Sequence, residues 1–517
     1  MIKKTYFLAC ASAATLFFGS CGSKRKAKVE PERPNIVFIL ADDMGYGDIQ
    51  ALNSSSRIPT PNLNALSEGG ATFTDAHTNS SVCTPTRYGV LTGRYCWRGR
   101  LKRGVINGYG KPVIEEGRET VASYLKTQGY KTGIVGKWHL GLEFDRQPEA
   151  KEGSANYGKP GAINYDKPLK RTPNDWGFDE SYIISASLDF PPYIYIKDRL
   201  ATELPTDKQE KLTAPTYMRA GEKAPSFNPE ETLDHLLGKA QTFIKESAKG
   251  EKPFFLYFPI TAPHKPVMPH KRFRGTTGLG HYADFVSQVD WTIGELNRTL
   301  KEAGVEDNTL VVYTSDNGSF MYSYDTAEQP VDNVADSSKL WFHPGSHRAN
   351  HVFRGTKADI WEGGHRVPFL VRWPDKIKNG VIVDSTVCLT DLFATVVDIT
   401  GGKLADNAGE DSFSFYSLLE EKQLEEARPP VIHHSIGGMF AIRDGKWKLV
   451  LGSGSGGRQK PRGKNFEKPY ALYDMEADIS ERKNLIDVYP EVAERLEKKC
   501  LEIKEIGSKK KTLEAGI

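Results

Sequence analysis

The stretch "NIVFILADD" (residues 35–43) joins a short, continuous apolar run to two carboxylates. Ile36 to Leu40 form the run, and Asp42 and Asp43 follow it. A run of this length, rich in β-branched and aromatic residues, is typical of a strand buried on both faces of a sheet. Taken alone, an Asp-Asp pair after a strand would serve equally well as a turn or a helix cap.

Three further segments repeat this arrangement. Apolar runs at 133–135, 254–258 and 310–313 are each followed by polar residues, and segments with helical spacing at 119–129 and 234–250 separate them. Strands that alternate with helices predict an α/β fold around a mostly parallel sheet. In such an open sheet, ligands bind outside the carboxyl ends of the strands. We therefore expect one site at that edge, formed by Asp42, Asp43, Lys137, His139, His264, Asp316 and Asn317.

The expected site residues fall into two chemical groups. The first offers only oxygen ligands, which favours Ca²⁺ and, less strongly, Mg²⁺ over zinc or copper. It consists of Asp42, Asp43, Asp316 and Asn317. The second group is basic and would surround the cation with a pocket for a tetrahedral oxyanion ester, either a sulfate or a phosphate. It consists of Lys137, His139, His264 and Lys357, the last within "FRGTKADIWEGGHR" (353–366).

The stretch "SSVCTPTRYGVLTGRY" (80–95) contains an unusual cysteine. Thr84 is expected to be an N-cap and Pro85 the first residue of a helix that ends at Gly93. Cys83 would then lie at a helix N-terminus, where the helix dipole favours a thiolate. A thiolate beside a cation held by oxygen ligands is, however, a mismatched pair.

Cys83, Pro85 and Arg87, followed by "LTGR", resemble the C-x-P-x-R signature of the type I sulfatases. Thr86 stands where the most familiar version of the signature has Ser or Ala. The blocks "GKWHLG" (136–141) and "TSDNG" (314–318) are similar to two further blocks of that family. The resemblance extends from about Pro34 to the end of the chain and is closest to the branch of arylsulfatase A and N-acetylgalactosamine-6-sulfatase. It implies an alkaline-phosphatase-like fold with a central mixed, mostly parallel sheet and helices on both faces.

The resemblance also implies a chemistry. A maturation enzyme would oxidise Cys83 to Cα-formylglycine before folding, and one hydroxyl of the hydrated aldehyde would attack sulfur while the other later expels the sulfate. Ca²⁺ would be held by Asp42, Asp43, Asp316, Asn317 and the modified Cys83. By the same resemblance, Arg87 would position the hydrate and His139 would assist the release of sulfate. Lys137 and Lys357 would bind sulfate oxygens, and Ser187 would also contact the sulfate. His264, with a share from Lys357, would protonate the leaving oxygen.

The substrate implied by the resemblance is a sulfated carbohydrate, with galactose or N-acetylgalactosamine sulfate favoured and small aryl sulfates as artificial substrates. Candidate contacts to sugar hydroxyls are Asp189, Asn350, His365 and Arg366. One alternative is a phosphate or phosphonate ester hydrolase of the same superfamily, which would usually need two metals and more ligands. Another is a non-catalytic glycan-binding lipoprotein, if Cys83 remains a thiol.

The two ends of the chain differ from its middle. Residues 1–20 carry two lysines, an apolar run too short to span a bilayer, and small residues before Cys21, as in a lipoprotein signal peptide. Cys21 would carry a lipid anchor, and 21–33 would be a flexible tether. These features predict an exported bacterial protein of the periplasm or outer membrane. We expect the catalytic domain at 34–405 and a smaller α+β subdomain with a short antiparallel sheet at 406–517.

Two observations narrow the classes of partner. The net charge is +3, from 69 basic and 66 acidic residues, so no global field favours nucleic acid. His343, His347 and His351 are spaced four apart, which on a helix would suggest a zinc site. Pro344 and Gly345 argue against a helix there, so we expect a loop at the rim of the pocket.

Overall fold

The computed structural model of the chain describes residue 1 and residues 33–150, 161–214, 216–324, 326, 328–422, 424 and 428–506. The expected signal peptide, Cys21 and the tether lie outside this part of the chain, apart from their end residues Met1 and Arg33. Within the described ranges, no helix combines the length and the apolar character needed to cross a bilayer.

The four apolar runs form the centre of a ten-stranded sheet. They are strands β1 (Asn35–Asp42), β4 (Lys131–Lys137), β10 (Phe254–Pro263) and β11 (Thr309–Ser315). They lie side by side in the order β11-β1-β10-β4 and are all parallel, and β5 (Glu180–Ile184) extends the parallel part beyond β4. The mostly parallel sheet expected from the sequence is therefore confirmed.

Shorter strands complete the sheet and make it mixed. On one side, β14 (Phe369–Arg372) and β2 (Ala71–Phe73) are antiparallel additions, and β15 (Val381–Val383) pairs in parallel with β2. On the other side, β6 (Ile196–Lys197) and β7 (Leu200–Ala201) follow β5 in antiparallel pairs.

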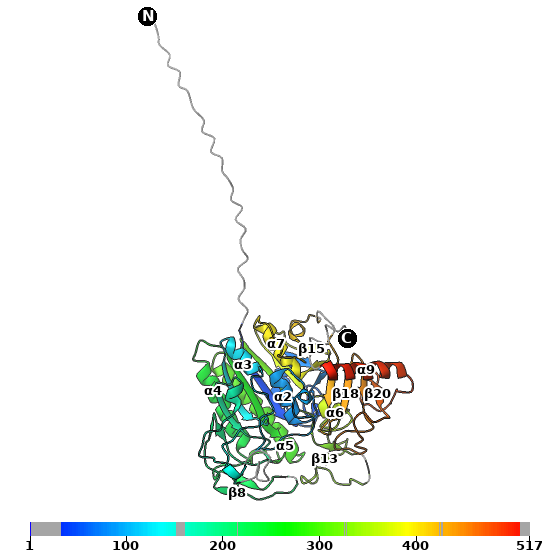
Figure 1. Cartoon of the computed structure of the whole chain (residues 1–517), viewed down its shortest axis with the longest axis horizontal. Coiled ribbons are helices and arrows are strands. Elements are labelled where there is room, and N and C mark those ends of the chain that lie inside the picture. Colours follow the sequence, from blue (N-terminus) through cyan, green and yellow to red (C-terminus); the bar gives the residue numbers. More distant parts are fainter. Residues whose placement is uncertain are drawn as a thin grey trace.

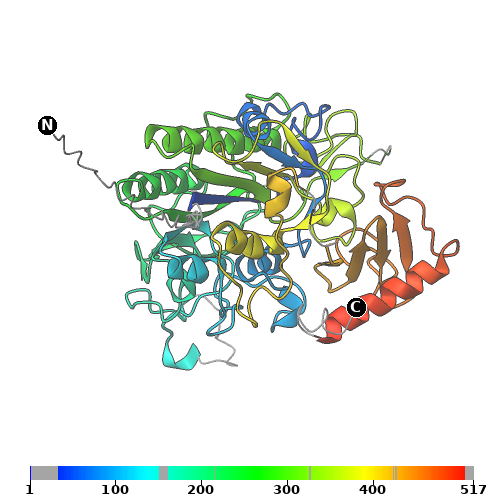
Figure 2. The same cartoon turned by 90° about the horizontal axis from the view of Figure 1, so that it is seen from above.

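Helices cover both faces of this sheet (Figures 1 and 2). One face carries α1 (Pro61–Glu68), α4 (Thr232–Ser247) and α5 (His281–Glu302). The other carries α2 (Cys83–Thr92), α3 (Val121–Thr127) and α7 (Leu392–Ile399), which pack against one another. Because both faces are covered, the central strands have no polar side, which explains their continuous apolar runs.

A second, smaller sheet follows toward the C-terminus and lies beside the main body (Figure 2). Its four strands lie side by side in the order of the sequence, and each pairs antiparallel with the next. They are β17 (Val431–His434), β18 (Phe440–Asp444), β19 (Trp447–Val450) and β20 (Ala471–Asp474). Helix α9 (Pro490–Ile506) packs on one face, where Phe440 and Ile442 contribute to its core. The short antiparallel sheet expected in the C-terminal subdomain is confirmed.

The opposite face of the small sheet packs against the main body. Ala441, which alternates with Phe440 and Ile442, belongs to a separate cluster with Ile360 and Trp361. The sequence placed the start of the smaller subdomain at residue 406. Phe415 and Leu418, by contrast, pack in the large core of the main body, and the second sheet begins at β17.

The remaining elements are short. They are β3 (Ala76–His77), β8 (Asp207–Gln209), β9 (Gly221–Lys223), β12 (Tyr322–Ser323), β13 (Trp341–Phe342), β16 (Val387–Cys388), α6 (Glu362–His365), α8 (Tyr416–Leu419) and the 3-10 turns Tyr46–Asp48, Cys96–Arg98, Pro148–Ala150, Pro173–Trp176 and Leu389–Asp391.

Candidate active site

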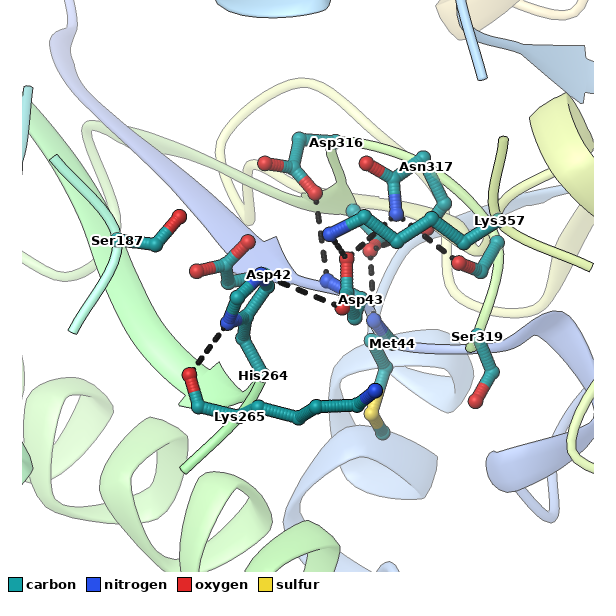
Figure 3. A network of polar contacts seen from close by, with 12 residues as sticks. Asp42, Asp43, Met44, Ser187, His264, Lys265, Asp316, Asn317, Ser319 and Lys357 are labelled. Atoms are coloured by element: carbon teal, nitrogen blue, oxygen red, sulfur yellow. Dashed lines mark hydrogen bonds and ion pairs between the residues drawn. The ribbon is translucent and has the colours of Figure 1, made fainter. Parts of the chain in front are cut away.

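The carboxyl ends of the central strands bring the expected polar residues together (Figure 3). Asp42 ends β1, Asp43 follows it, and Asp316 and Asn317 follow β11 directly. His264 comes immediately after β10. The cluster is closed by buried residues from β4, α2 and the loop before α6, namely Lys137, Cys83, Arg87 and Lys357.

Two lysines neutralise the carboxylates of the Asp-Asp pair. Lys137 Nζ donates to both carboxylate oxygens of Asp42 at 2.8 Å, and Lys357 Nζ donates to Asp43 Oδ1 at 2.5 Å. Burial alone would raise the pKa of the Asp42 carboxyl, but His264, Lys137 and the other cations hold it well below its usual range. Both carboxylates are therefore ionised and available as ligands.

Arg87 links helix α2 to two strand ends. Its Nε and Nη2 donate to Asp316 Oδ2 at 3.0 and 2.6 Å, and its Nη1 donates to the carbonyl oxygen of Lys137 at 3.0 Å. Burial, with Asp42 close by, still raises the pKa of the Asp316 carboxyl to about 6. Three carboxylates thus face three permanent cations, so that an added divalent cation would make the pocket positive enough for an anionic ester.

The Asn317 side chain is only half satisfied. Its Nδ2 donates to Asp43 Oδ1 at 2.7 Å, but its Oδ1 is buried and has no hydrogen-bond partner in the described part of the chain. Buried carbonyl oxygens are rarely left without a partner. A carbonyl oxygen beside three carboxylates matches the oxygen ligands that Ca²⁺ and Mg²⁺ prefer. The residues present therefore fit a hard divalent cation.

Cys83 is the first residue of α2, and its cap is Val82. The expectation that Thr84 is the N-cap was wrong, because the Thr84 hydroxyl instead accepts from the backbone N–H of Ile106 at 3.4 Å. Pro85 still falls in the first turn, where a missing N–H is tolerated. The helix ends at Gly93, which has a φ of 61°, as expected. Burial raises the pKa of the Cys83 thiol, so an unmodified Cys83 would be a neutral thiol and a weak nucleophile.

His139 lies two residues beyond β4 and is held in one tautomer. Its Nε2 is 2.8 Å from the carbonyl oxygen of Ile106, so Nε2 carries the proton and donates. Nδ1 is then an acceptor, and the Ser187 hydroxyl donates to it at 3.4 Å. Burial, with Lys137 and Arg87 nearby, holds the pKa of His139 well below its usual value. His139 is therefore a neutral base with Nδ1 available.

The backbone that presents His139 needs a glycine. Gly136 has a φ of 134°, and a Cβ there would lie 2.0 Å from the carbonyl oxygen of Pro259 on the neighbouring strand β10. Close approach of β4 and β10 thus requires the glycine of the "GKWH" block. His139 and Asp43 themselves have positive φ values of 56° and 67°, which are strained for non-glycine residues and occur most often at functional sites.

Residues 34–402 match the model of the sulfatase family. The chain belongs to the sulfatase family. A Bacteroides thetaiotaomicron N-acetylgalactosamine-6-O-sulfatase is 30% identical over 90% of this chain and 92% of its own. Human arylsulfatase H is 27% identical over 78% of this chain and 75% of its own.

Solved structures agree with the family assignment. One solved structure comes from work on the metabolism of multiple glycosaminoglycans by Bacteroides thetaiotaomicron. It is 27% identical to this chain, with a TM-score of 0.78, and the match covers 92% of this chain and 99% of that one. A phosphonate monoester hydrolase of Agrobacterium radiobacter shares the fold alone, at 17% identity and a TM-score of 0.58 over 92% of this chain and 96% of its own. The alkaline-phosphatase-like sulfatase fold is confirmed. The sulfatase is an enzyme that hydrolyses sulfate esters, and its family implies a formylglycine and a divalent metal.

His264 of the sulfatase offers one ring nitrogen to the site. Its Nδ1 is 2.5 Å from the carbonyl oxygen of Lys265, so Nδ1 donates there, and Nε2 faces Asp43 Oδ2 at 3.6 Å. Burial lowers the pKa of His264, although Asp42 and Asp43 act in the opposite direction. A proton for a leaving group would therefore have to be carried on Nε2.

The expected sugar contacts divide into two groups. Ser187 faces His139, and Asp189, two residues further on, is paired with Arg219. Asn350 lies beside the loop after β11, but its side chain is engaged there: Oδ1 accepts from Ser319 N at 2.8 Å and Nδ2 donates to Ser319 O at 3.0 Å. It therefore positions that loop.

The structure does not bring His365 and Arg366 into the site. Arg366 pairs with Asp75 and Glu362, and His365 is fully buried against His77. These residues, with His433 and Lys448, form a polar network between the main body and the small sheet. Their side chains are used for packing the two parts together, which leaves none of them free to reach a sugar.

His77, His365 and His433 of this network have ring nitrogens close enough to suggest a metal. The rings of His365 and His433 are, however, stacked 3.7 Å apart with planes only 11° from parallel. A metal must lie in the plane of each ring that binds it, so two stacked rings do not share one. Lys448 Nζ also donates a hydrogen bond to His365 Nε2 at 2.9 Å. The network is a hydrogen-bonded contact between subdomains.

The histidines at 343, 347 and 351 have separate partners, in agreement with a loop rather than a zinc site. His347 Nε2 is 2.8 Å from Asp48 Oδ1, whereas His343 Nδ1 faces the carbonyl oxygen of Tyr324 and His351 packs on Phe353.

Sequence reasoning missed one cation beside the pocket, Lys265, whose side chain lies next to His264 (Figure 3). Lys265 directly follows the expected His264, and this adjacency was the only sequence signal that could have found it.

Proposed function

We propose that this sulfatase removes sulfate from a sulfated carbohydrate, with galactose or N-acetylgalactosamine sulfate of a glycosaminoglycan, mucin or algal glycan as the favoured substrate. The observation that carries the reaction is the buried cluster of Asp42, Asp43, Asp316 and the unpartnered Asn317 Oδ1 beside Cys83. The carbohydrate is supported by the 30% identical relative, which is named an N-acetylgalactosamine-6-O-sulfatase.

The metal in this proposal is Ca²⁺. Asp42, Asp43, Asp316 and Asn317 would hold it, together with the modified Cys83, and an all-oxygen ligand set suits Ca²⁺ better than the smaller Mg²⁺, which dehydrates reluctantly. When bound, the cation would supply positive charge that polarises the sulfate, and the formylglycine would supply an oxygen nucleophile.

Formylglycine would be formed from Cys83 by a maturation enzyme before the chain folds. The burial of Cys83 supports this order, because its side chain is only 2% exposed and lies beneath the pocket in the folded protein. An enzyme that modifies cysteine would find this side chain only in the unfolded chain. The proposed lipid anchor at Cys21 and location in the periplasm or outer membrane rest on the sequence pattern of the first 33 residues.

The basic residues of the site would have separate roles toward the substrate. Each lysine ammonium has three donors, so Lys137 and Lys357 have N–H groups left for sulfate oxygens after binding Asp42 and Asp43. His139 Nδ1, the unprotonated ring nitrogen, would take the proton released when sulfate is expelled. His264 Nε2, with a share from Lys357, would give a proton to the leaving sugar oxygen.

Turnover on matched esters tests this proposal. Purified, matured enzyme is assayed with an aryl sulfate, the corresponding aryl phosphate, and 6-sulfated galactose and N-acetylgalactosamine. We expect sulfate release from the aryl and at least one sugar sulfate, and much slower release of phosphate. Faster hydrolysis of the phosphate ester, or release from aryl sulfate alone across a panel of sugar sulfates, would contradict the proposal.

A further inference from the structure

A cavity of about 510 Å³ lies between the main body and the small subdomain, outside the carboxylate cluster. The main body contributes the 3-10 turn at Cys96–Arg98 and the basic run that continues from it, residues 98–104. The small subdomain contributes the start of β18 and the end of α9, and Arg98 Nη1 joins the two parts by donating to the carbonyl oxygen of Ile503 at 3.0 Å. The lining includes Trp97, Arg98, Lys102, Arg103, Phe440 and Lys504.

A row of aromatic rings connects the two walls of this cavity. The ring centres of Trp97 and Phe440 are 5.3 Å apart, and those of Phe440 and Phe466 are 5.6 Å apart. At one end of the row, Lys102 Nζ donates to the carbonyl oxygen of Trp97 at 2.7 Å. At the other end, Lys504 Nζ lies 5.0 Å from the ring centre of Phe466. Each wall therefore holds one ammonium group against the same row of rings.

The cations of the cavity differ in whether they have an acidic partner. Arg98 is neutralised by a carboxylate 2.8 Å away. In the part of the chain that the structure describes, Lys102, Arg103 and Lys504 are exposed and form no ion pair with a carboxylate. Among the described residues that line the cavity, Glu505 is the only acidic one. Three unpaired cations outweigh this one carboxylate, so the cavity suits an anion.

The indole of Trp97 offers a second kind of contact. The residue is only 6% exposed, yet within the described ranges its Nε1–H has no hydrogen-bond partner. Buried donors are rarely left unpaired. Because Trp97 lines the cavity, a hydroxyl or sulfate oxygen of a bound molecule is a candidate acceptor for this N–H.

Both walls of the cavity continue into the active site. The wall formed by the main body leads from Lys102 to Ile106, whose carbonyl oxygen holds His139 Nε2 at 2.8 Å. Lys102 and Ile106 are four residues apart, so their Cα atoms are separated by at most about 14 Å. On the other wall, Ile436 N donates to the carbonyl oxygen of Ala358 at 3.1 Å, directly after the catalytic lysine. This separation is short enough for one oligosaccharide to contact both the cavity and the sulfate pocket.

We propose that this cavity binds an anionic stretch of a saccharide chain and holds a polymeric substrate on the enzyme while a sulfate further along the chain is cleaved. This inference rests on the proposed carbohydrate function. The cavity has the size of a site for a small molecule or a short part of a chain. The enzyme's own C-terminal residues are an unfavourable occupant, because Lys509, Lys510 and Lys511 carry the same charge as the cavity.

Binding without turnover tests the cavity directly. Cys83→Ala protein is titrated with a sulfated glycosaminoglycan, a sulfated algal galactan and uncharged dextran. We expect at least one sulfated chain to bind, with an affinity that falls as salt is added, and dextran not to bind. Adding Lys102→Gln and Lys504→Gln together to this protein should weaken the binding about tenfold, because two charge-assisted contacts are lost.

A second double variant serves as the matched control. Lys271→Gln with Lys301→Gln removes the same charge at two exposed lysines outside the cavity, and should change the binding by less than about twofold. The melting temperature of each variant is measured first, to show that it is folded.

Turnover connects the cavity to catalysis. With Cys83 intact, we compare kcat/KM on the sulfated chain with kcat/KM on an aryl sulfate, which is too small to reach the cavity. The ratio of the two should fall about tenfold in K102Q/K504Q and stay at the wild-type value in the control variant. An unchanged ratio in K102Q/K504Q would show that the cavity does not hold the substrate.

The outcomes separate the two proposals. If neither sulfated chain binds, or if the folded K102Q/K504Q variant binds as tightly as its parent, the saccharide site is overturned while the hydrolysis of sugar sulfates still stands. Tighter binding to phosphatidylglycerol vesicles than to either chain would assign the cavity to a lipid surface and also overturn it. Cleavage of aryl sulfate without release of sulfate from any saccharide would overturn the carbohydrate function itself.

Discussion

Arg87 and Asp316 are joined by two hydrogen bonds to a single carboxylate oxygen, from Nε at 3.0 Å and Nη2 at 2.6 Å. Both side chains are completely buried. Arg87 follows Cys83 by four residues, about one turn of α2, so this pair sets the position of the cysteine relative to the end of β11. The arginine of the C-x-P-x-R signature therefore has a structural role in addition to any contact with the reacting group.

Replacing Arg87 with lysine should destabilise the protein. Arg87→Lys keeps the charge but loses the forked donation to Asp316 and the bond to the carbonyl oxygen of Lys137. We expect the free energy of unfolding to fall by about 2–4 kcal/mol in denaturant titrations. Arg103→Lys, at an exposed arginine, is the control and should change it by less than about 0.5 kcal/mol. An Arg87→Lys variant as stable as the wild type would contradict this role.

Removal of the Cys83 side chain should abolish turnover. Cys83→Ala leaves the helix and the pairing of Arg87 intact, so its circular dichroism and melting temperature should stay close to the wild-type values. Activity on aryl sulfate should fall below about 1%, because the covalent nucleophile is gone. Cys96→Ala, at another buried cysteine, should retain activity. Residual turnover well above that level in the Cys83 variant would argue against covalent catalysis.

Chelation should lower the stability of the protein. Loss of the cation leaves Asn317 Oδ1 without a partner and the carboxylates without their ligand. We expect the melting temperature to fall on addition of a calcium-selective chelator and to recover with Ca²⁺ more fully than with Mg²⁺. At a free Ca²⁺ concentration 100 times the Kd, the stabilisation should be about 2.7 kcal/mol.

A variant makes the metal test specific to this site. Asn317→Ala should retain the fold and show a smaller Ca²⁺-dependent shift than the wild type. Superimposable melting curves for the wild type with and without the chelator would show that no stabilising cation is bound.

Acid should destabilise the contact between the main body and the small sheet. Burial, with His77 and Lys448 nearby, holds the pKa of His433 well below 6.5. As the pH falls below about 6.5, the unfolded chain binds a proton at this histidine that the folded chain does not bind. The free energy of unfolding therefore decreases as the pH falls, by up to about 1.4 kcal/mol per pH unit for each such group.

His433→Asn tests this dependence. The amide can still donate to the carbonyl oxygen of Thr78, which His433 Nδ1 faces at 3.1 Å, but it does not titrate. The slope of the unfolding free energy against pH is proportional to the number of protons bound on unfolding. Between pH 6.5 and 5, this number should be smaller in the variant by about one. An unchanged slope in the His433 variant would mean that His433 is not the buried neutral group described here.

The sequence could predict the centre of the fold because its signal is local. Strands β1, β4, β10 and β11 are buried on both faces of the sheet, so the sequence of each is one continuous apolar run. Because these strands are parallel, the residues that follow the four runs lie at the same edge of the sheet. The two-residue strands β6 and β7 at the edge have no such run and depend on neighbours for their pairing.

The site was predictable where a motif marks it and not where distant segments meet. His365 and Arg366 were expected at the sugar because they follow Lys357 closely in the sequence. In the structure the chain turns after Lys357, and both residues bind partners from other elements, Lys448 and Asp75. No pattern in the local sequence indicates these contacts.

The central claim is that Cys83 becomes an aldehyde beside a hard cation, and mass spectrometry of the peptide that spans Cys83 tests it most directly. A formylglycine residue is about 18 Da lighter than cysteine, because the thiol and one hydrogen give way to a carbonyl oxygen. We expect this mass in protein that is matured and active on sulfate esters. An unmodified cysteine in protein with full sulfatase activity would contradict the account.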